Sequence, residues 1–195
     1  VINALKFRSV EVPLTPKGRK DIEKLAKKLT WKHIDYIFSS DLLRTKQTAE
    51  IVGKEIGAEI KYDERLREAN VGIFNGQSLE KLKKAWGKPI ERFTRKVEGG
   101  ETYNDVKKRV YDFLKDIDKN YQGKKILLIS HECPISFIEC LSLGFSDKEI
   151  VSYRGKKQIE TGEWRKLEFK KLPYNEKLEL DFHRPYIDGV KFYCK

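Results

Sequence analysis

The stretch FSSDLLRTKQTAE, residues 38–50, connects a short apolar run to a helical pattern. The apolar run, residues 34–38, predicts a strand that ends at two serines. Asp41 is the expected cap of the following helix, so that Arg44 lies in its first turn. A helix N-terminus offers unpaired N–H groups with a partial positive charge, and an arginine adds a planar fork of donors. The stretch therefore predicts a phosphate-binding turn between a strand and a helix.

The rest of the chain alternates between helical and strand patterns. Strands are expected at 59–62 and 125–129, and the continuous apolar run of the latter is typical of a buried parallel strand. The helix after Asp41 is expected to end near Gly57. Further helices are expected at 16–29, at 78–95 (one or two helices), at 134–141, and after the caps Thr102 and Ser146, with a hairpin over 158–169. Strands that alternate with helices predict a three-layer α/β/α domain with a mainly parallel sheet.

Composition limits the class of protein. The 195 residues are 39% hydrophobic, which suffices for the core of one globular domain. No apolar run is long enough to span a membrane, and three widely spaced cysteines favour a reducing, cytoplasmic location. The formal net charge of +11 is spread along the chain. It indicates either a solvated surface or a surface that contacts nucleic acid.

Two further residues are candidates for chemistry. His131 follows the apolar run 125–129, at the carboxyl end of a strand, where α/β sheets place their ligand sites. Glu68 lies in an irregular, glycine-containing segment and can act as a general acid if its pKa is raised. Taken alone, His131 could also cap a strand end, and Glu68 could be an ordinary surface carboxylate.

Taken together, the motifs resemble the histidine phosphatase superfamily, the phosphoglycerate-mutase-like group, over residues 13–169. Five segments follow the family's order: PLTPKGRKDIEKLA at 13–26, SSDLLRTKQTAE at 39–50, RLREANVGIFNG at 65–76, GGETYNDVKKRV at 99–110 and ILLISHECPI at 126–135. The resemblance implies that Arg44 binds the transferred phosphoryl group, that His131 donates a hydrogen bond to it, and that Glu68 is the proton donor. The implied substrate is a phosphorylated small molecule, and the implied reaction forms and hydrolyses a phosphohistidine without a cofactor.

The chain departs from the family's pattern in two ways. The family's nucleophile lies in an Arg-His-Gly motif at the end of its first strand, and no such motif occurs here. The first strand is therefore expected to be missing, and the 195-residue chain alone is expected to be inactive. Glu132 follows His131 where the family has glycine, and a carboxylate beside a phosphate pocket is repulsive unless it points away.

Other catalytic classes fit the sequence poorly. Neither Cys133 nor Cys140 is followed at loop distance by the arginine that a cysteine phosphatase needs. The three histidines, His33, His131 and His183, lack the spacing of metal ligands.

The segment LDFHRPYIDGVKFYC, residues 180–194, resembles a part of class I isoleucyl-tRNA synthetases. The resemblance implies that Cys194 is the first cysteine of a zinc-binding pair, and that tRNA is a partner through the host protein. The expected domains are a histidine-phosphatase-like domain at 1–171 and a linker with a synthetase-like segment at 172–195. The absence of methionine also favours an excised piece of a longer protein, and a free phosphatase with a C-terminal extension is the alternative.

Two functional hypotheses follow. The first is a phosphomonoester hydrolase or phosphotransfer domain, inserted in an isoleucyl-tRNA synthetase that carries out ATP-dependent aminoacylation. The second is a non-catalytic module of the same fold that serves tRNA binding or synthetase architecture.

Overall fold

The computed structural model describes residues 12–157 and 159–167. Its elements follow the predicted alternation, with short 3₁₀ turns between some of them. They are α1 (Pro16–Leu29), β1 (Tyr36–Ser39), α2 (Leu43–Ile56), β2 (Glu59–Tyr62), α3 (Leu79–Trp86), α4 (Tyr103–Asn120), β3 (Ile126–Ile129), α5 (Glu132–Ser142) and α6 (Asp147–Lys156).

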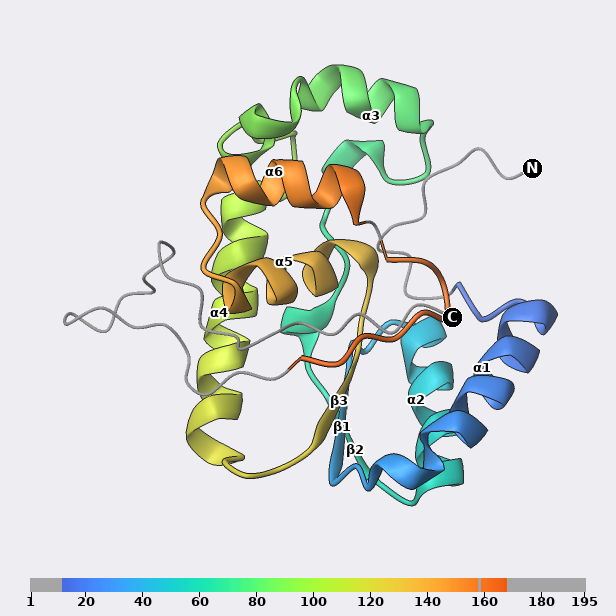
Figure 1. The fold of residues 1–195 in the computed structure, drawn as a ribbon. Coiled ribbons are helices and arrows are strands. Elements are labelled where there is room, and N and C mark those ends of the chain that lie inside the picture. Colours follow the sequence, from blue (N-terminus) through green and yellow to red (C-terminus); the bar gives the residue numbers. More distant parts are fainter. Residues whose placement is uncertain (1–11, 158, 168–195) are drawn as a thin grey trace.

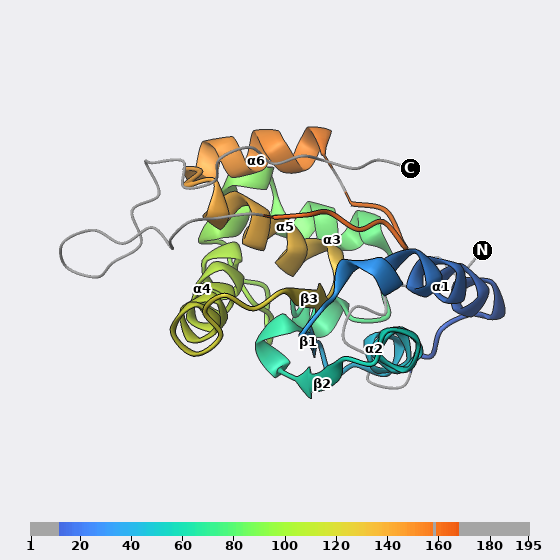
Figure 2. The same cartoon turned by 60° about the horizontal axis from the view of Figure 1, so that its bottom comes forward.

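The strands form a parallel sheet in the order β2-β1-β3, with β1 in the centre. Helices α1 and α2 cover one face, whereas α4 and α5 cover the other (Figures 1 and 2). This arrangement confirms the predicted three-layer α/β/α fold with a parallel sheet.

The side chains of β1 alternate between two apolar clusters. Ile37 packs with buried residues of α1 and α2, and Phe38 packs with those of α4 and α5. Because successive side chains of a strand point to opposite faces, one four-residue strand anchors both helical layers. The carboxyl ends of all three parallel strands consequently lie at one edge of the sheet.

Local signals at the helix ends agree with the sequence in most places. The Thr15 hydroxyl accepts a hydrogen bond from the Gly18 N–H at the start of α1, and Gly57 ends α2 in the left-handed conformation. Thr102 and Asp105 form a capping box at the start of α4. These caps confirm the predicted starts of α1 and α4 and the predicted end of α2.

The prediction that Asp41 caps α2 is wrong. Leu42 is the residue at the cap position, and no side chain caps that helix end. The Asp41 carboxylate instead accepts two hydrogen bonds from Arg67, with its Oδ1 2.6 Å from Nε. A bidentate guanidinium is a stronger partner than a single backbone N–H, so the carboxylate turns toward the loop that follows β2.

The prediction that the strand at 125–129 is buried is also wrong. β3 is parallel as expected, but all four of its residues are partly exposed. It lies at the edge of the sheet, and within the described residues no strand pairs with its outer side. The expected hairpin over 158–169 is not formed in its described part, because 159–167 holds a turn at Thr161 and Gly162 but no strand.

Within residues 12–157 and 159–167, no helix is long and apolar enough to cross a membrane. The predicted domain boundary between 171 and 172 and the predicted zinc ligand Cys194 lie outside the described residues.

Candidate active site

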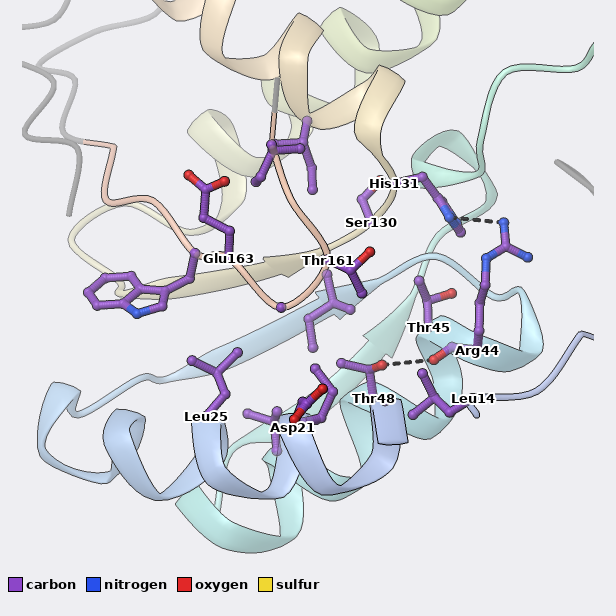
Figure 3. Close-up of a pocket in the computed structure, with 18 of the residues that line it drawn as sticks. Leu14, Asp21, Leu25, Arg44, Thr45, Thr48, Ser130, His131, Thr161 and Glu163 are labelled. Atoms are coloured by element: carbon purple, nitrogen blue, oxygen red, sulfur yellow. Dashed lines mark hydrogen bonds between the residues drawn. The ribbon is translucent and has the colours of Figure 1, made fainter. Parts of the chain in front are cut away.

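The three predicted site residues meet in one pocket of about 510 Å³. Arg44 lies in the first turn of α2, just after β1, and His131 precedes α5, just after β3. Glu68 reaches the pocket from the irregular segment after β2. Figure 3 shows Arg44 and His131 pointing toward one another at the end of the sheet. The structure therefore brings the three side chains that the sequence singled out together at the carboxyl edge of the sheet.

The contacts of His131 define which of its nitrogens carries a proton. Its Nδ1 lies 3.0 Å from Nη2 of Arg44, and its Nε2 lies 2.9 Å from the Ser40 hydroxyl oxygen. A guanidinium can only donate, so Nδ1 accepts and Nε2 carries the proton. The imidazole is therefore neutral in this arrangement and donates through Nε2 to Ser40.

Ser40 is a site residue that the sequence analysis did not single out. Its hydroxyl oxygen also lies 3.4 Å from the Leu42 N–H, and its carbonyl oxygen accepts a hydrogen bond from the Thr45 hydroxyl at 2.9 Å. The serine thus ties the end of β1 to both α2 and His131. Its position inside the quoted stretch, directly after an apolar strand, was the available signal.

Arg44 is half-buried in the pocket. Burial lowers the pKa of its guanidinium from the ordinary value, and the nearby Glu68 carboxylate opposes that effect. The group nevertheless stays cationic, because an arginine guanidinium does not deprotonate in proteins. Arg44 therefore places a fixed positive charge at the pocket.

Glu68 is buried, and one of its carboxyl oxygens accepts a hydrogen bond from the Ala69 N–H at 2.9 Å. Burial is the main cause that raises the pKa of Glu68 to about 7. The Glu132 carboxylate adds to the rise, whereas Arg154 and Arg44 oppose it. A carboxyl group with this pKa is partly protonated at neutral pH, as a proton donor requires.

The segment that carries Glu68 is held by contacts with the approach to α4. Asn70 and Glu101 exchange two hydrogen bonds, of 2.7 and 2.8 Å, and Val71 forms a bridge with Gly100. Gly72 has a φ of +54°, and a Cβ atom there would lie 1.8 Å from the Glu98 carbonyl oxygen. Only glycine permits this close approach of two backbones.

The Glu132 carboxylate lines the pocket, but its charge is paired. One of its carboxylate oxygens accepts a hydrogen bond from the Ser136 hydroxyl at 3.0 Å, and the other lies 2.8 Å from Nη2 of Arg154. Arg154, on α6, had no signal in the sequence, because its role depends on how α6 packs against α5.

Other chemistries find little support among the described residues. These contain no group of histidine, cysteine and acidic side chains that could hold a metal ion. Burial raises the pKa of both Cys133 and Cys140 to about 12, which keeps them as thiols. The exclusion of a cysteine nucleophile from sequence therefore agrees with their surroundings.

The fold is that of the phosphoglycerate-mutase-like histidine phosphatases, as solved structures show. The mycobacterial glucosyl-3-phosphoglycerate phosphatase superposes with a TM-score of 0.74 and 20% sequence identity, over 87% of this chain and 84% of its own. YhfR from Bacillus stearothermophilus gives a TM-score of 0.74 and 22% identity, over 92% and 89% of the two chains.

The chain belongs to the histidine phosphatase superfamily (branch 1), whose sequence model matches residues 5–175. Among its relatives is the protein named "Probable phosphoglycerate mutase GpmB" of Salmonella choleraesuis (strain SC-B67), 31% identical over 137 residues. That match covers 68% of this chain, and the chain spans 64% of the relative's length.

Proposed function

We propose that this chain forms the phosphate-binding and proton-donating part of a phosphomonoester hydrolase or phosphotransferase that acts on a phosphorylated small molecule. The observation that carries the proposal is the convergence of Arg44, His131 and Glu68 in one pocket at the carboxyl edge of the sheet. The names of the relatives agree with this class, since they include a phosphoglycerate mutase and a glucosyl-3-phosphoglycerate phosphatase.

Each side chain has a distinct role in the proposed reaction. Arg44 neutralises the phosphoryl oxygens, and His131 redirects its Nε2–H from Ser40 to one of them. A nucleophilic histidine forms an N–P bond while the ester O–P bond breaks, and the proton of Glu68 passes to the leaving oxygen. Water then attacks phosphorus while the N–P bond breaks, Glu68 takes up a proton from the water, and inorganic phosphate and the free histidine are released. The reaction needs no cofactor.

The nucleophilic histidine is proposed to come from outside these 195 residues. His33 is exposed and precedes the amino end of β1, so it lies at the edge of the sheet opposite to the pocket. The outer side of β3 borders the pocket and a second cavity of about 980 Å³, and both cavities are lined by Leu127, Leu128 and Trp164. An extended segment beside β3, parallel to it, would end next to His131.

Turnover tests this assignment of the nucleophile. The 195-residue chain alone is expected to hydrolyse no p-nitrophenyl phosphate. Addition of an apolar peptide that ends in Arg-His-Gly is expected to produce activity that a peptide ending in Arg-Ala-Gly does not. Hydrolysis by the pure chain alone would refute the need for an outside histidine.

Binding of inorganic phosphate tests the pocket itself. Loss of a charge-assisted contact costs about 1.5–3 kcal/mol, so Arg44→Ala is expected to weaken phosphate binding at least about tenfold in calorimetry. Arg95→Ala is the matched control, because Arg95 is exposed and pairs with Glu91 on the surface. Equal affinity of the wild-type chain and Arg44→Ala would exclude the pocket as the phosphate site.

A second candidate function rests on the C-terminal resemblance to isoleucyl-tRNA synthetases. The family match ends at residue 175, before the resembling segment 180–194 begins. In this proposal the domain is an insertion in the synthetase, with Cys194 a zinc ligand of the host and tRNA its partner. The non-catalytic version keeps the fold and the anion pocket and serves tRNA binding.

The natural protein and its RNA affinity test this candidate. Antibodies against residues 16–157 are expected to recover a synthetase-sized protein that catalyses isoleucine-dependent ATP–pyrophosphate exchange. In the non-catalytic version, the 195-residue chain also shifts tRNA in gel electrophoresis. Recovery of a small protein without exchange activity would contradict the insertion.

A further inference from the structure

A buried cation lies behind the proposed proton donor. The guanidinium of Arg154, on α6, packs over the rings of Tyr103 and Phe137, at 4.7 and 5.3 Å from their centroids. Its Nη2 lies 2.8 Å from a carboxylate oxygen of Glu132, and its Nη1 lies 3.4 Å from the Cys133 sulfur. Arg154 is therefore held in place by aromatic rings and by the first turn of α5.

Arg154 and Glu132 act on Glu68 in opposite directions, because the arginine lowers the pKa of its carboxyl group and the glutamate raises it. The Arg154 side chain is only 13% exposed, so solvent screens its charge weakly. An unpaired arginine close to a buried carboxyl group favours the ionised carboxylate and would deprive the site of its proton donor. Glu132 supplies the compensating negative charge, and a second hydrogen bond, from Ser136, fixes its orientation.

We propose that Glu132, by pairing with Arg154, prevents that buried cation from ionising the Glu68 carboxyl group, and that Glu132 is a positioning residue for the proton donor. The catalytic consequence rests on the proposed function, whereas the electrostatic coupling is a property of this chain and is testable without turnover. Glu132, which stands after His131 where the family has glycine, then supports the proton donor and does not impair the site.

The electrostatic surroundings of Glu68 agree with this proposal. The ionisable groups that act on Glu68 or touch its surroundings are Arg44 from α2, His131, Glu132 and Cys133 from the start of α5, and Arg154 from α6. The pocket is also lined by three further carboxylates, Asp21 of α1 and Glu160 and Glu163 of the segment after α6. After burial, Glu132 is the charged group that raises the pKa of Glu68, while both arginines lower it. Arg154 therefore opposes protonation of Glu68, and Glu132 counteracts it.

A carboxyl ¹³C NMR titration of the 195-residue chain tests the coupling, with the Glu68 resonance assigned through Glu68→Gln. Glu132→Gln keeps the shape of the side chain but removes its charge. This variant is expected to lower the pKa of Glu68 by at least ~0.5. A shift of this size is a small part of the interaction energy between the Glu132 and Arg154 charges. Ser136→Ala leaves both charges in place, so it is the matched control and is expected to leave the pKa unchanged.

Arg154→Gln provides a test of opposite sign. It is expected to raise the pKa of Glu68, and the double variant Glu132→Gln/Arg154→Gln is expected to return it close to the wild-type value. If Arg154→Gln fails to fold, two variants of Glu132 decide the test. Glu132→Gln is expected to lower the pKa of Glu68, whereas Glu132→Asp keeps the negative charge and is expected to keep that pKa high. An unchanged Glu68 pKa in Glu132→Gln, or an equal shift in Ser136→Ala, would overturn the proposal.

Phosphate affinity separates this inference from the proposed function. Glu132→Gln is expected to bind inorganic phosphate at least as tightly as the wild-type chain, because a negative charge near the pocket is lost. Failure of the wild-type chain to bind phosphate would reject the proposed function but leave the Glu68 coupling measurable.

Discussion

At the scale of single residues, the pocket depends on proton positions. Arg44 donates to Nδ1 of His131, which directs the proton of the imidazole to Nε2. Glu68 keeps its proton to a higher pH than an ordinary glutamate because it is buried. A hydrogen bond thus fixes the position of the His131 proton, and burial retains the Glu68 proton. Both protons are in place before phosphate binds.

The raised pKa of Glu68 predicts a pH-dependent stability. Below pH 4.5 the carboxyl group is protonated in both the folded and the unfolded chain. As pH rises to about 7, the unfolded chain loses this proton while the folded chain retains it. The free energy of unfolding therefore falls by about 3 kcal/mol across this window and then stays constant.

Urea unfolding of wild-type and Glu68→Gln chains between pH 5 and pH 8 measures this effect. The stability of Glu68→Gln relative to the wild-type chain is expected to increase with pH across this range. The neighbouring, exposed Glu64→Gln is the control and is expected to give a constant difference. A constant difference for Glu68→Gln as well would mean that Glu68 titrates normally.

At the scale of elements, the site depends on how irregular segments are held. Neither a helix nor a strand carries Glu68, so backbone contacts between residues 70–72 and 98–101 place it. Arg109 of α4 reinforces them through a hydrogen bond to Glu101, with its Nε 3.0 Å from Oε1. Such a segment keeps its geometry only while both backbones can approach closely.

Gly72→Ala tests this close approach. Gly72 and Gly76 both have positive φ angles, of +54° and +84°, but only at Gly72 would a Cβ atom collide with backbone. Gly76→Ala is therefore expected to cost about 1–2 kcal/mol of conformational strain, and Gly72→Ala at least about 3 kcal/mol. Thermal unfolding measures both, and equal costs would show that the loop yields without strain.

At the scale of the whole molecule, β3 has one side that pairs with β1 and one side on which no described residue forms a strand. The carbonyl oxygens of Lys125 and Ile129 accept hydrogen bonds from residues at the two ends of β1. Because successive residues of a strand alternate in direction, Leu127 also faces β1, whereas Ile126 and Leu128 face outward. In the described part of the chain, no strand pairs with these outward groups.

Hydrogen exchange of the β3 amides is expected to alternate. The N–H groups of Ile126 and Leu128 are expected to exchange at least about tenfold faster than those of Leu127 and Ile129. Addition of the Arg-His-Gly peptide should slow the fast pair selectively. Four equally slow amides in the chain alone would mean that another segment or a second copy already pairs with this edge.

Much of the fold was predictable because its signals are local. Thr15, Gly57 and Thr102 mark helix ends through contacts within a few residues, and the alternation of elements sets the sheet. Asp41 was predicted wrongly because its partner, Arg67, is 26 residues away. The exposure of β3 escaped prediction because an apolar run does not tell an edge strand from a central one.

By itself, the sequence determined the order of the elements, the family and the three side chains that meet at the carboxyl edge of the sheet. The tertiary structure alone decided that Ser40 joins them, that Arg154 pairs with Glu132, and that Glu68 holds its proton near neutral pH. The physical reason is range. Helix caps and strand patterns arise between neighbours in the chain, whereas charge compensation arises only when side chains of α2, α5 and α6 act on one buried carboxyl group.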